Sequence, residues 1–199
     1  MIIRHVKKSN VSEMFQKFRD VSITLQDISK KNPPKSGFYE YKLKYSEFEK
    51  RALSPLSLVC IDDSKVVSYL LSLQISEVNN LINSGITNPV FNRIKGLDKN
   101  VIYFDQLLVS RDLPAHAFAA RILQTGDRLA QEIGSPGAIG ATPVSPWYNL
   151  APHNLIRYQG FMKKDTVKTD SCNLGLYVKP YWKLDTPFEN FGNDLILPN

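Results

Sequence analysis

The stretch of sequence that decides the fold reads VIYFDQLLVS (101–110), RDLPAHAF (111–118) and AARILQTGDRLAQEIG (119–134). Its first part is a run of apolar residues interrupted by Asp105, which predicts a buried strand over Val101–Val109. Its last part carries apolar residues at helical spacing and ends at Gly134, a residue type common at helix C-termini. We therefore predict a helix over Ala115–Ile133, with one apolar face formed by Phe118, Ile122, Leu129 and Ile133.

The residues that follow predict a strand, a short helix and two more strands. Small residues indicate a strand over Ala138–Val144. Pro143 and Pro146 weaken hydrogen bonding there, so we expect the sheet to open at this point. A short helix is predicted over Leu150–Gln159, with Pro152 tolerated in its first turn. The last two strands are expected over Phe161–Val167 and Leu174–Val178.

The N-terminal half predicts a strand, two helices and a hairpin. Asn10 is the predicted N-cap of the first helix, with Glu13 as its capping-box partner. The hairpin turn is Asp62-Asp63-Ser64-Lys65, which is rich in residues that hydrogen-bond their own backbone. The other elements expected here are a strand over Met1–Val6, a short helix within Gly37–Ser54, and the hairpin strands Leu56–Ile61 and Val66–Ile75.

The segment Ser76–Asn100 gives no clear periodicity. It is rich in asparagine and contains Gly85, Pro89 and Gly96. It is long for a simple connection, and connections of this length usually carry function or disorder. Two interpretations stay open: a lid on the substrate side of a site, or a surface excursion without a catalytic role.

Composition restricts the class of protein. The 199 residues are 43% hydrophobic and 22% charged, which is ordinary for one globular domain with a substantial core. No apolar run approaches the roughly 18 residues of a membrane span, and MIIRHVKKSN lacks the apolar core of a signal peptide. We therefore expect a cytoplasmic protein with no membrane partner, and a single domain over 1–199 that includes a C-terminal tail over 184–199.

Charge and metal-binding residues exclude further classes. The net charge of +6 comes from scattered basic pairs, a pattern that does not favour a nucleic-acid partner but suits a protein that binds a polyphosphate. Cys60 and Cys172 are too few and too far apart for a zinc cluster. His5, His116 and His153 have no metal-ligand spacing, so no metal site is expected.

The order of strand, helix, strand, short helix and Gly160-Phe161, with Asn149 before the short helix, resembles the acetyl-CoA-dependent N-acetyltransferase (GNAT) superfamily. The resemblance covers Val101–Phe161. It implies an α/β (α+β) fold in which helices flank a mixed, mostly antiparallel central sheet. It also implies acetyl transfer from acetyl-CoA to the primary amine of a small-molecule or peptide acceptor, and it leaves a homodimer open.

The phosphate-binding loop is where the chain departs from the family pattern, Arg/Gln-x-x-Gly-x-Gly/Ala. The matching positions are Pro114, Ala117 and Ala119, of which only Ala119 fits. Two interpretations stay open: the backbone N–H groups at the helix start still bind the pyrophosphate, or the segment is only a good helix start. The cofactor-binding residues implied by the resemblance are Leu107, Leu108, Val109, Ala115, His116, Ala117, Phe118, Ala119, Ala120 and Asn149.

Asp105 and Tyr158 are the candidate catalytic residues. Asp105 matches the strand position where relatives place a carboxylate base, or a carboxylate that holds the base water. Its alternative role is a carboxylate satisfied by neighbouring backbone or by a lysine. The family's tyrosine acid lies four residues before the glycine of Gly-Phe, a position that Ile156 occupies here, and Tyr158 is two residues away on the predicted helix.

Two functions from different classes remain. The first is an N-acetyltransferase, which Asp105, Asn149 and Gly160-Phe161 favour. The second is a non-catalytic binding module of the same fold with an altered or lost cofactor site, which the changed loop and Ile156 favour.

Overall fold

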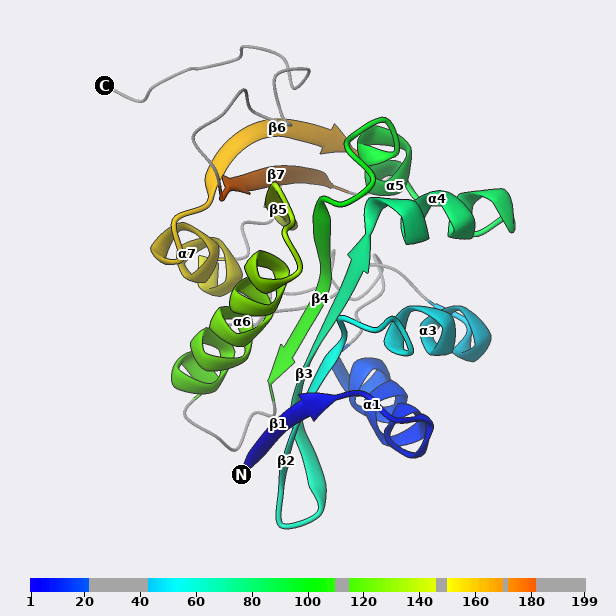
Figure 1. Cartoon of the computed structure of the whole chain (residues 1–199), viewed down its shortest axis with the longest axis vertical. Coiled ribbons are helices and arrows are strands. Elements are labelled where there is room, and N and C mark those ends of the chain that lie inside the picture. Colours follow the sequence, from blue (N-terminus) through cyan, green and yellow to red (C-terminus); the bar gives the residue numbers. More distant parts are fainter. Residues whose placement is uncertain (22–42, 110–114, 146–149, 170–171, 182–199) are drawn as a thin grey trace.

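The structure is a computed structural model, and Figure 1 traces the whole chain. The residues that it describes are 1–21, 43–109, 115–145, 150–169 and 172–181. The predicted loop over 110–114, Asn149 and the predicted tail therefore lie outside the described residues.

The described elements alternate between strands and helices along the chain. None of the described helices is long and apolar enough to cross a membrane. The elements are β1 (Ile2–His5), α1 (Lys8–Val21), α3 (Tyr45–Ala52), β2 (Leu58–Asp62), β3 (Lys65–Gln74), α4 (Ile75–Asn83), α5 (Pro89–Ile94), β4 (Ile102–Val109), α6 (Ala115–Glu132), β5 (Gly137–Ser145), α7 (Leu150–Tyr158), β6 (Met162–Lys168) and β7 (Asn173–Pro180).

One seven-stranded sheet, in the order β1-β2-β3-β4-β5-β7-β6, forms the centre of the fold. Every neighbouring pair is antiparallel except β4 and β5, which are parallel. Helices α6 and α7 cover one face of the sheet, and α1, α3, α4 and α5 cover the other (Figure 1). The predicted mixed, mostly antiparallel sheet flanked by helices is confirmed.

The sheet opens between β4 and β5. The two strands pair only through Ile102 with Ala138, Tyr103 with Ile139 and Phe104 with Gly140. Past these pairs β4 continues along β3 and β5 continues along β7, and no further β4–β5 pair occurs among the described residues. The predicted opening of the sheet is confirmed. It lies at the C-terminal ends of the two parallel strands, on the side where β4 leads toward α6.

A β-bulge in β4 lies at the start of this opening. Leu71 of β3 pairs with Gln106, but its neighbour Ser72 pairs with Phe104, so Asp105 is the extra residue. A bulge interrupts the alternation of side chains between the two faces of a sheet. It therefore determines which face Asp105 and the residues after it occupy.

The first helix begins earlier than predicted. Helix α1 starts at Lys8. Asn10 is not its N-cap, because its side-chain Oδ1 instead accepts a hydrogen bond from the Lys7 backbone N–H at 3.1 Å. Glu13 is not the partner of Asn10 either, since its carboxylate accepts from the Val66 backbone N–H at 2.8 Å and ties α1 to the hairpin. The helix boundary and the capping box predicted from Asn10 were wrong.

The segment predicted as a lid or a surface excursion is mainly two helices, α4 and α5. Glu77 accepts a hydrogen bond from the Gln74 backbone N–H at 2.8 Å, and Asn88 caps α5 by accepting from Phe91 N–H at 2.8 Å. Val78 and Phe91 are fully buried in a cluster with residues of β3, β4, β5, β6 and β7. A surface excursion is therefore the wrong description, because these helices form part of the core.

Helix α6 begins where it was predicted to begin and ends at Glu132, one residue earlier than predicted. It begins at Ala115, and Gly134 follows its C-terminus with a φ of 76°, in the left-handed region that favours glycine. Ile122 is buried as expected. Ile133 lies one residue beyond the helix and is 48% exposed, so its predicted place on the buried face was wrong.

Gly126 sets how closely α6 approaches the sheet, which makes it a test of the packing. A Cβ atom at Gly126 would lie 2.5 Å from Cδ2 of the fully buried Leu70. We expect Gly126→Val to lower the free energy of unfolding by about 1–3 kcal/mol, because the added carbons overpack the core. Gly96→Val is the matched control, since a Cβ there meets nothing within 4 Å. Chemical denaturation measures both, and equal stability of the two variants would contradict the packing.

Candidate active site

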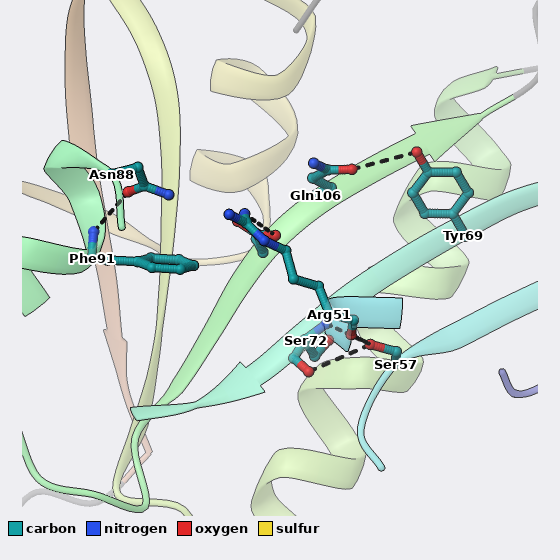
Figure 2. A network of polar contacts seen from close by, with 8 residues as sticks. Arg51, Ser57, Tyr69, Ser72, Asn88, Phe91 and Gln106 are labelled. Atoms are coloured by element: carbon teal, nitrogen blue, oxygen red, sulfur yellow. Dashed lines mark hydrogen bonds and ion pairs between the residues drawn. The ribbon is translucent and has the colours of Figure 1, made fainter. Parts of the chain in front are cut away.

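A buried ion pair joins α3 to the bulge of β4. Nη1 of Arg51 lies 3.0 Å from Oδ2 and 3.2 Å from Oδ1 of Asp105. The two side chains are 1% and 0% exposed. The Arg51 guanidinium also lies 4.7 Å from the ring centroid of Phe91, so α5 covers the same cation (Figure 2). Three elements far apart in the sequence therefore meet at one charged pair.

The backbone at the end of α3 is held against the sheet by a bridging serine. The Ser57 hydroxyl donates to the Arg51 carbonyl at 3.1 Å and accepts from the Ser72 backbone N–H at 3.1 Å. Ser72 pairs with Phe104 in β4, directly beside the bulge. The bridge ties the Arg51 backbone to β3 through Ser57 and Ser72 (Figure 2).

The side chains around the bulge face the helices α1 and α3. Asp105 contacts Arg51, and the neighbouring Gln106 has its Oε1 3.5 Å from the hydroxyl of Tyr69, which packs among α1 and α3 residues. Two consecutive residues of β4 thus face the same side, as a bulge allows. Leu107 returns to the opposite face and packs with the α6 side of the core.

Arg51 is the group that neutralises the buried Asp105 carboxylate. The sequence left backbone or a lysine as alternatives to a catalytic role, and the partner is an arginine. Removing one member of a buried ion pair usually costs about 3–5 kcal/mol, because the remaining charge is left desolvated. Asp105 therefore contributes to the fold, and its role as a base stays a proposal.

The structure places the predicted cofactor residues at the opening of the sheet and at the start of α6. Leu107, Leu108 and Val109 lie in the part of β4 that has left β5. Residues 115–120 form the first turns of α6, where the first N–H groups of a helix have no partner within it. Ala117 is exposed. Asn149 lies outside the described residues.

Tyr158 does not meet Asp105. It is the last residue of α7 and is 84% exposed, whereas Asp105 is buried. The structure instead reveals a tyrosine that the sequence argument missed. The hydroxyl of Tyr177 on β7 lies 2.5 Å from Nδ1 of His153 on α7, with the rings edge to face at 5.4 Å. The available signal was that His153 precedes Ile156 by one helical turn and so shares its face.

Burial and neighbouring positive charges lower the pKa of His153. The pKa of His153 is lowered, first by desolvation and then by the positive charges of Arg157 and Lys163. The neutral imidazole is therefore favoured at pH 7. Tyr177 is fully buried, so the pair spans from the interior of the sheet to a half-buried helix position.

A groove of about 330 Å³ lies between α3 and α4, and it is lined by Lys50, Leu73, Glu77, Asn80, Leu81 and Ser84. Its carboxylate, Glu77, accepts hydrogen bonds from the Ser54 hydroxyl and the Gln74 N–H. Among the described residues, no group of three or more histidine, cysteine, aspartate or glutamate side chains could hold a metal ion.

Comparison with known proteins identifies the fold. No family model and no curated protein sequence matches this chain. In contrast, 207 chains of solved structures match it. One is an agmatine N-acetyltransferase, at 8% identity and a TM-score of 0.63 over 90% of this chain and 98% of that one. Another is a ribosomal-protein-alanine N-acetyltransferase from Brucella melitensis, at 14% identity and 0.60 over 90% and 99%.

Two more matches carry the family name and the cofactor. A GNAT-family acetyltransferase from Streptococcus agalactiae matches at 14% identity and a TM-score of 0.62, over 92% of this chain and 96% of that one. The NatC complex bound to Gag peptide and CoA matches at 10% identity and 0.60, over 91% and 98%. The sheet that opens between β4 and β5, with α6 following β4, is thus the fold of the GNAT superfamily of N-acetyltransferases.

Proposed function

We propose that this protein is an N-acetyltransferase that moves an acetyl group from acetyl-CoA to a primary amine of a small-molecule or peptide acceptor. The observation that carries the proposal is the opening between β4 and β5, with a bulge at its vertex and the start of α6 beyond it. Structures of similar fold include enzymes named for agmatine, for polyamines and for a ribosomal-protein alanine. All of these names describe acetylation of an amine.

The described residues fit coenzyme A as a co-substrate in two places. Where β4 and β5 separate, their backbones can hold an extended pantetheine arm as another strand would be held. At the start of α6, where Ala117 is exposed, the first N–H groups have no partner within the helix and could bind a pyrophosphate, which the positive end of the helix dipole attracts. The altered loop therefore removes side-chain donors but leaves the backbone donors.

Acetyl transfer needs two proton transfers. The acceptor ammonium must lose a proton before its nitrogen attacks the thioester carbonyl carbon. As the tetrahedral carbon collapses, the C–S bond breaks and the departing sulfur gains from a proton donor. In the proposal Asp105, at the vertex of the opening, takes the amine proton directly or through a water. Tyr158, the donor candidate from the sequence, is 84% exposed at the end of α7, whereas Asp105 at the vertex is buried.

The competing function is a GNAT-fold binding module without catalysis. Two observations favour it: the changed phosphate loop, and the engagement of Asp105 by Arg51. A carboxylate held by a buried arginine can serve the fold alone. The two functions predict different results for cofactor binding and for turnover.

The first test removes one backbone donor at the start of α6. Ala117→Pro eliminates an N–H group, and Ala117 lies in the first helical turn, where proline is tolerated best. We expect the affinity for acetyl-CoA, measured by calorimetry, to fall several-fold with the melting temperature nearly unchanged. Ala117→Gly is the control, because it keeps the N–H group. Equal affinity of the proline variant and the wild type would remove the helix start from the cofactor site.

The second test separates the two roles of Asp105. Asp105→Asn keeps the size of the side chain but removes the proton acceptor and the partner of Arg51. A base predicts turnover reduced by about 10²–10⁴-fold at pH 7, with a smaller defect at pH 9 where more amine is already neutral. Cofactor affinity should be unchanged. The assay is release of the coenzyme A thiol with a primary amine as acceptor.

Asp127→Asn is the matched control for stability. Asp127 is another buried aspartate, paired with Lys179 and hydrogen-bonded to Tyr181, and it lies on α6 far along from the opening. Both variants should have a lower melting temperature than the wild type, but only the Asp105 variant should lose turnover. An Asp105 variant that melts early and turns over at the wild-type rate below its melting temperature would assign this carboxylate to the fold alone.

A further inference from the structure

Three polar side chains gather where β5 and β7 run under α7. Tyr177 on β7 pairs with Gly140 of β5, and its hydroxyl contacts His153 of α7 at 2.5 Å. Gly140 faces α7, because a Cβ there would lie 3.5 Å from Ile156. Thr142 follows Gly140 by two residues and so faces α7 as well. These residues share one face of the sheet.

Gly175 leaves room for the Tyr177 ring beside the half of β5 that has separated from β4. A Cβ at Gly175 would lie 2.9 Å from Cε2 and 3.3 Å from the hydroxyl of Tyr177, and 2.9 Å from Cγ1 of Val144. The ring therefore lies over Gly175 and beside Val144. Val144 belongs to the half of β5 that has left β4, and Gly175 pairs directly with Thr142. The phenol thus lies beside the strand that borders the opening.

Thr142 gives an independent indication that a ligand belongs here. Its side chain is 2% exposed, and its hydroxyl has no hydrogen-bond partner in the part of the chain that the structure describes. Buried hydroxyl groups are nearly always paired, and an unpaired one is destabilising. A polar group of a bound molecule in the opening would satisfy it.

We propose that Tyr177 is the catalytic proton donor to the departing sulfur, with His153 as the residue that positions and re-protonates it. The inference rests on the proposed function, acetyl transfer from acetyl-CoA. The thioester C–S bond breaks, its electron pair goes to the sulfur, and the Tyr177 O–H proton moves to that sulfur. The product is the free thiol of coenzyme A, and a phenolate is left at Tyr177.

His153 restores the phenol without a net change of its own charge. The neutral ring with hydrogen on Nδ1 donates that proton to the phenolate oxygen while Nε2 takes a proton from solvent. His153 is half-buried, so its far nitrogen can exchange with water, and Nδ1 faces the tyrosine. Desolvation, and after it the charges of Arg157 and Lys163, lower the pKa of His153 and favour the neutral ring at the start of each cycle.

The contact with sulfur is tested by calorimetry on the full chain with coenzyme A and with desulfo-coenzyme A, which lacks only the sulfur. Wild type should bind coenzyme A about fivefold more tightly, the value of one hydrogen bond. Tyr177→Phe should abolish that preference while leaving the affinity for desulfo-coenzyme A unchanged. Tyr181→Phe is the matched control, because it removes a half-buried tyrosine hydroxyl just after the same strand, one that donates to Asp127 instead.

The proton transfer is tested by thiol release from acetyl-CoA with a simple primary amine at high concentration. Tyr177→Phe should lower kcat by about 10²–10⁴-fold with the KM for acetyl-CoA unchanged, and Tyr181→Phe should retain the wild-type kcat. His153→Phe should lower kcat by a smaller factor and shift the pH profile.

The outcomes separate this inference from the proposed function. A wild type that releases thiol, together with a Tyr177→Phe variant of equal kcat, overturns the donor role and leaves acetyl transfer standing. If the Tyr177→Phe variant still binds coenzyme A more tightly than desulfo-coenzyme A, the donor role is also overturned. A wild type that binds no coenzyme A, or binds it without turnover, overturns the proposed function and the donor role with it.

Discussion

The buried ion pair of Arg51 and Asp105 fixes the place where the sheet opens. Both charges are removed from water, so each depends on the other, and loss of either leaves a desolvated charge that costs about 3–5 kcal/mol. The pair determines the spacing of α3 and β4, and Phe91 of α5 covers the guanidinium. It also holds the extra residue of the bulge in place, and the bulge begins the half of β4 that no longer pairs with β5.

This arrangement separates the two sides of the reaction that we propose. On one face of the sheet the bulge presents Asp105 and Gln106 toward α3 and α1. On the other face Tyr177, His153 and Thr142 lie under α7, beside the separated half of β5. An acetyl group carried into the opening would have a proton acceptor on one side and a proton donor on the other. In the proposal the backbone at the same opening holds the pantetheine arm, and the start of α6 holds the phosphates.

The sequence predicted what local pattern encodes. Helix α6 followed from its spacing and Gly134, and the β2–β3 hairpin followed from its turn. The residues 76–100 were misjudged, although Asn88 before a proline is a helix-start signal that was present. Asparagine-rich helices carry weak propensity, and burial against the sheet stabilises them instead.

The candidate site could be predicted only in part, for a physical reason. An apolar run buried on both faces has no alternation, so the bulge at Asp105 leaves no mark in the sequence. Arg51 meets Asp105 from 54 residues away, and Tyr177 meets His153 from 24 residues away, so neither contact follows from spacing. Asp105 itself could be identified from the sequence, because a charged residue in a buried apolar strand requires either a partner or a catalytic role.

Hydrogen exchange measured by mass spectrometry, with and without coenzyme A, tests the central claim most directly. If the opening between β4 and β5 receives the cofactor, coenzyme A should slow exchange in peptides covering 105–109, 115–120 and 141–145. Peptides covering α3 and α4, which line the groove on the other face, should exchange at the same rate in both samples. Unchanged exchange at the opening, or protection confined to α3 and α4, would contradict the account.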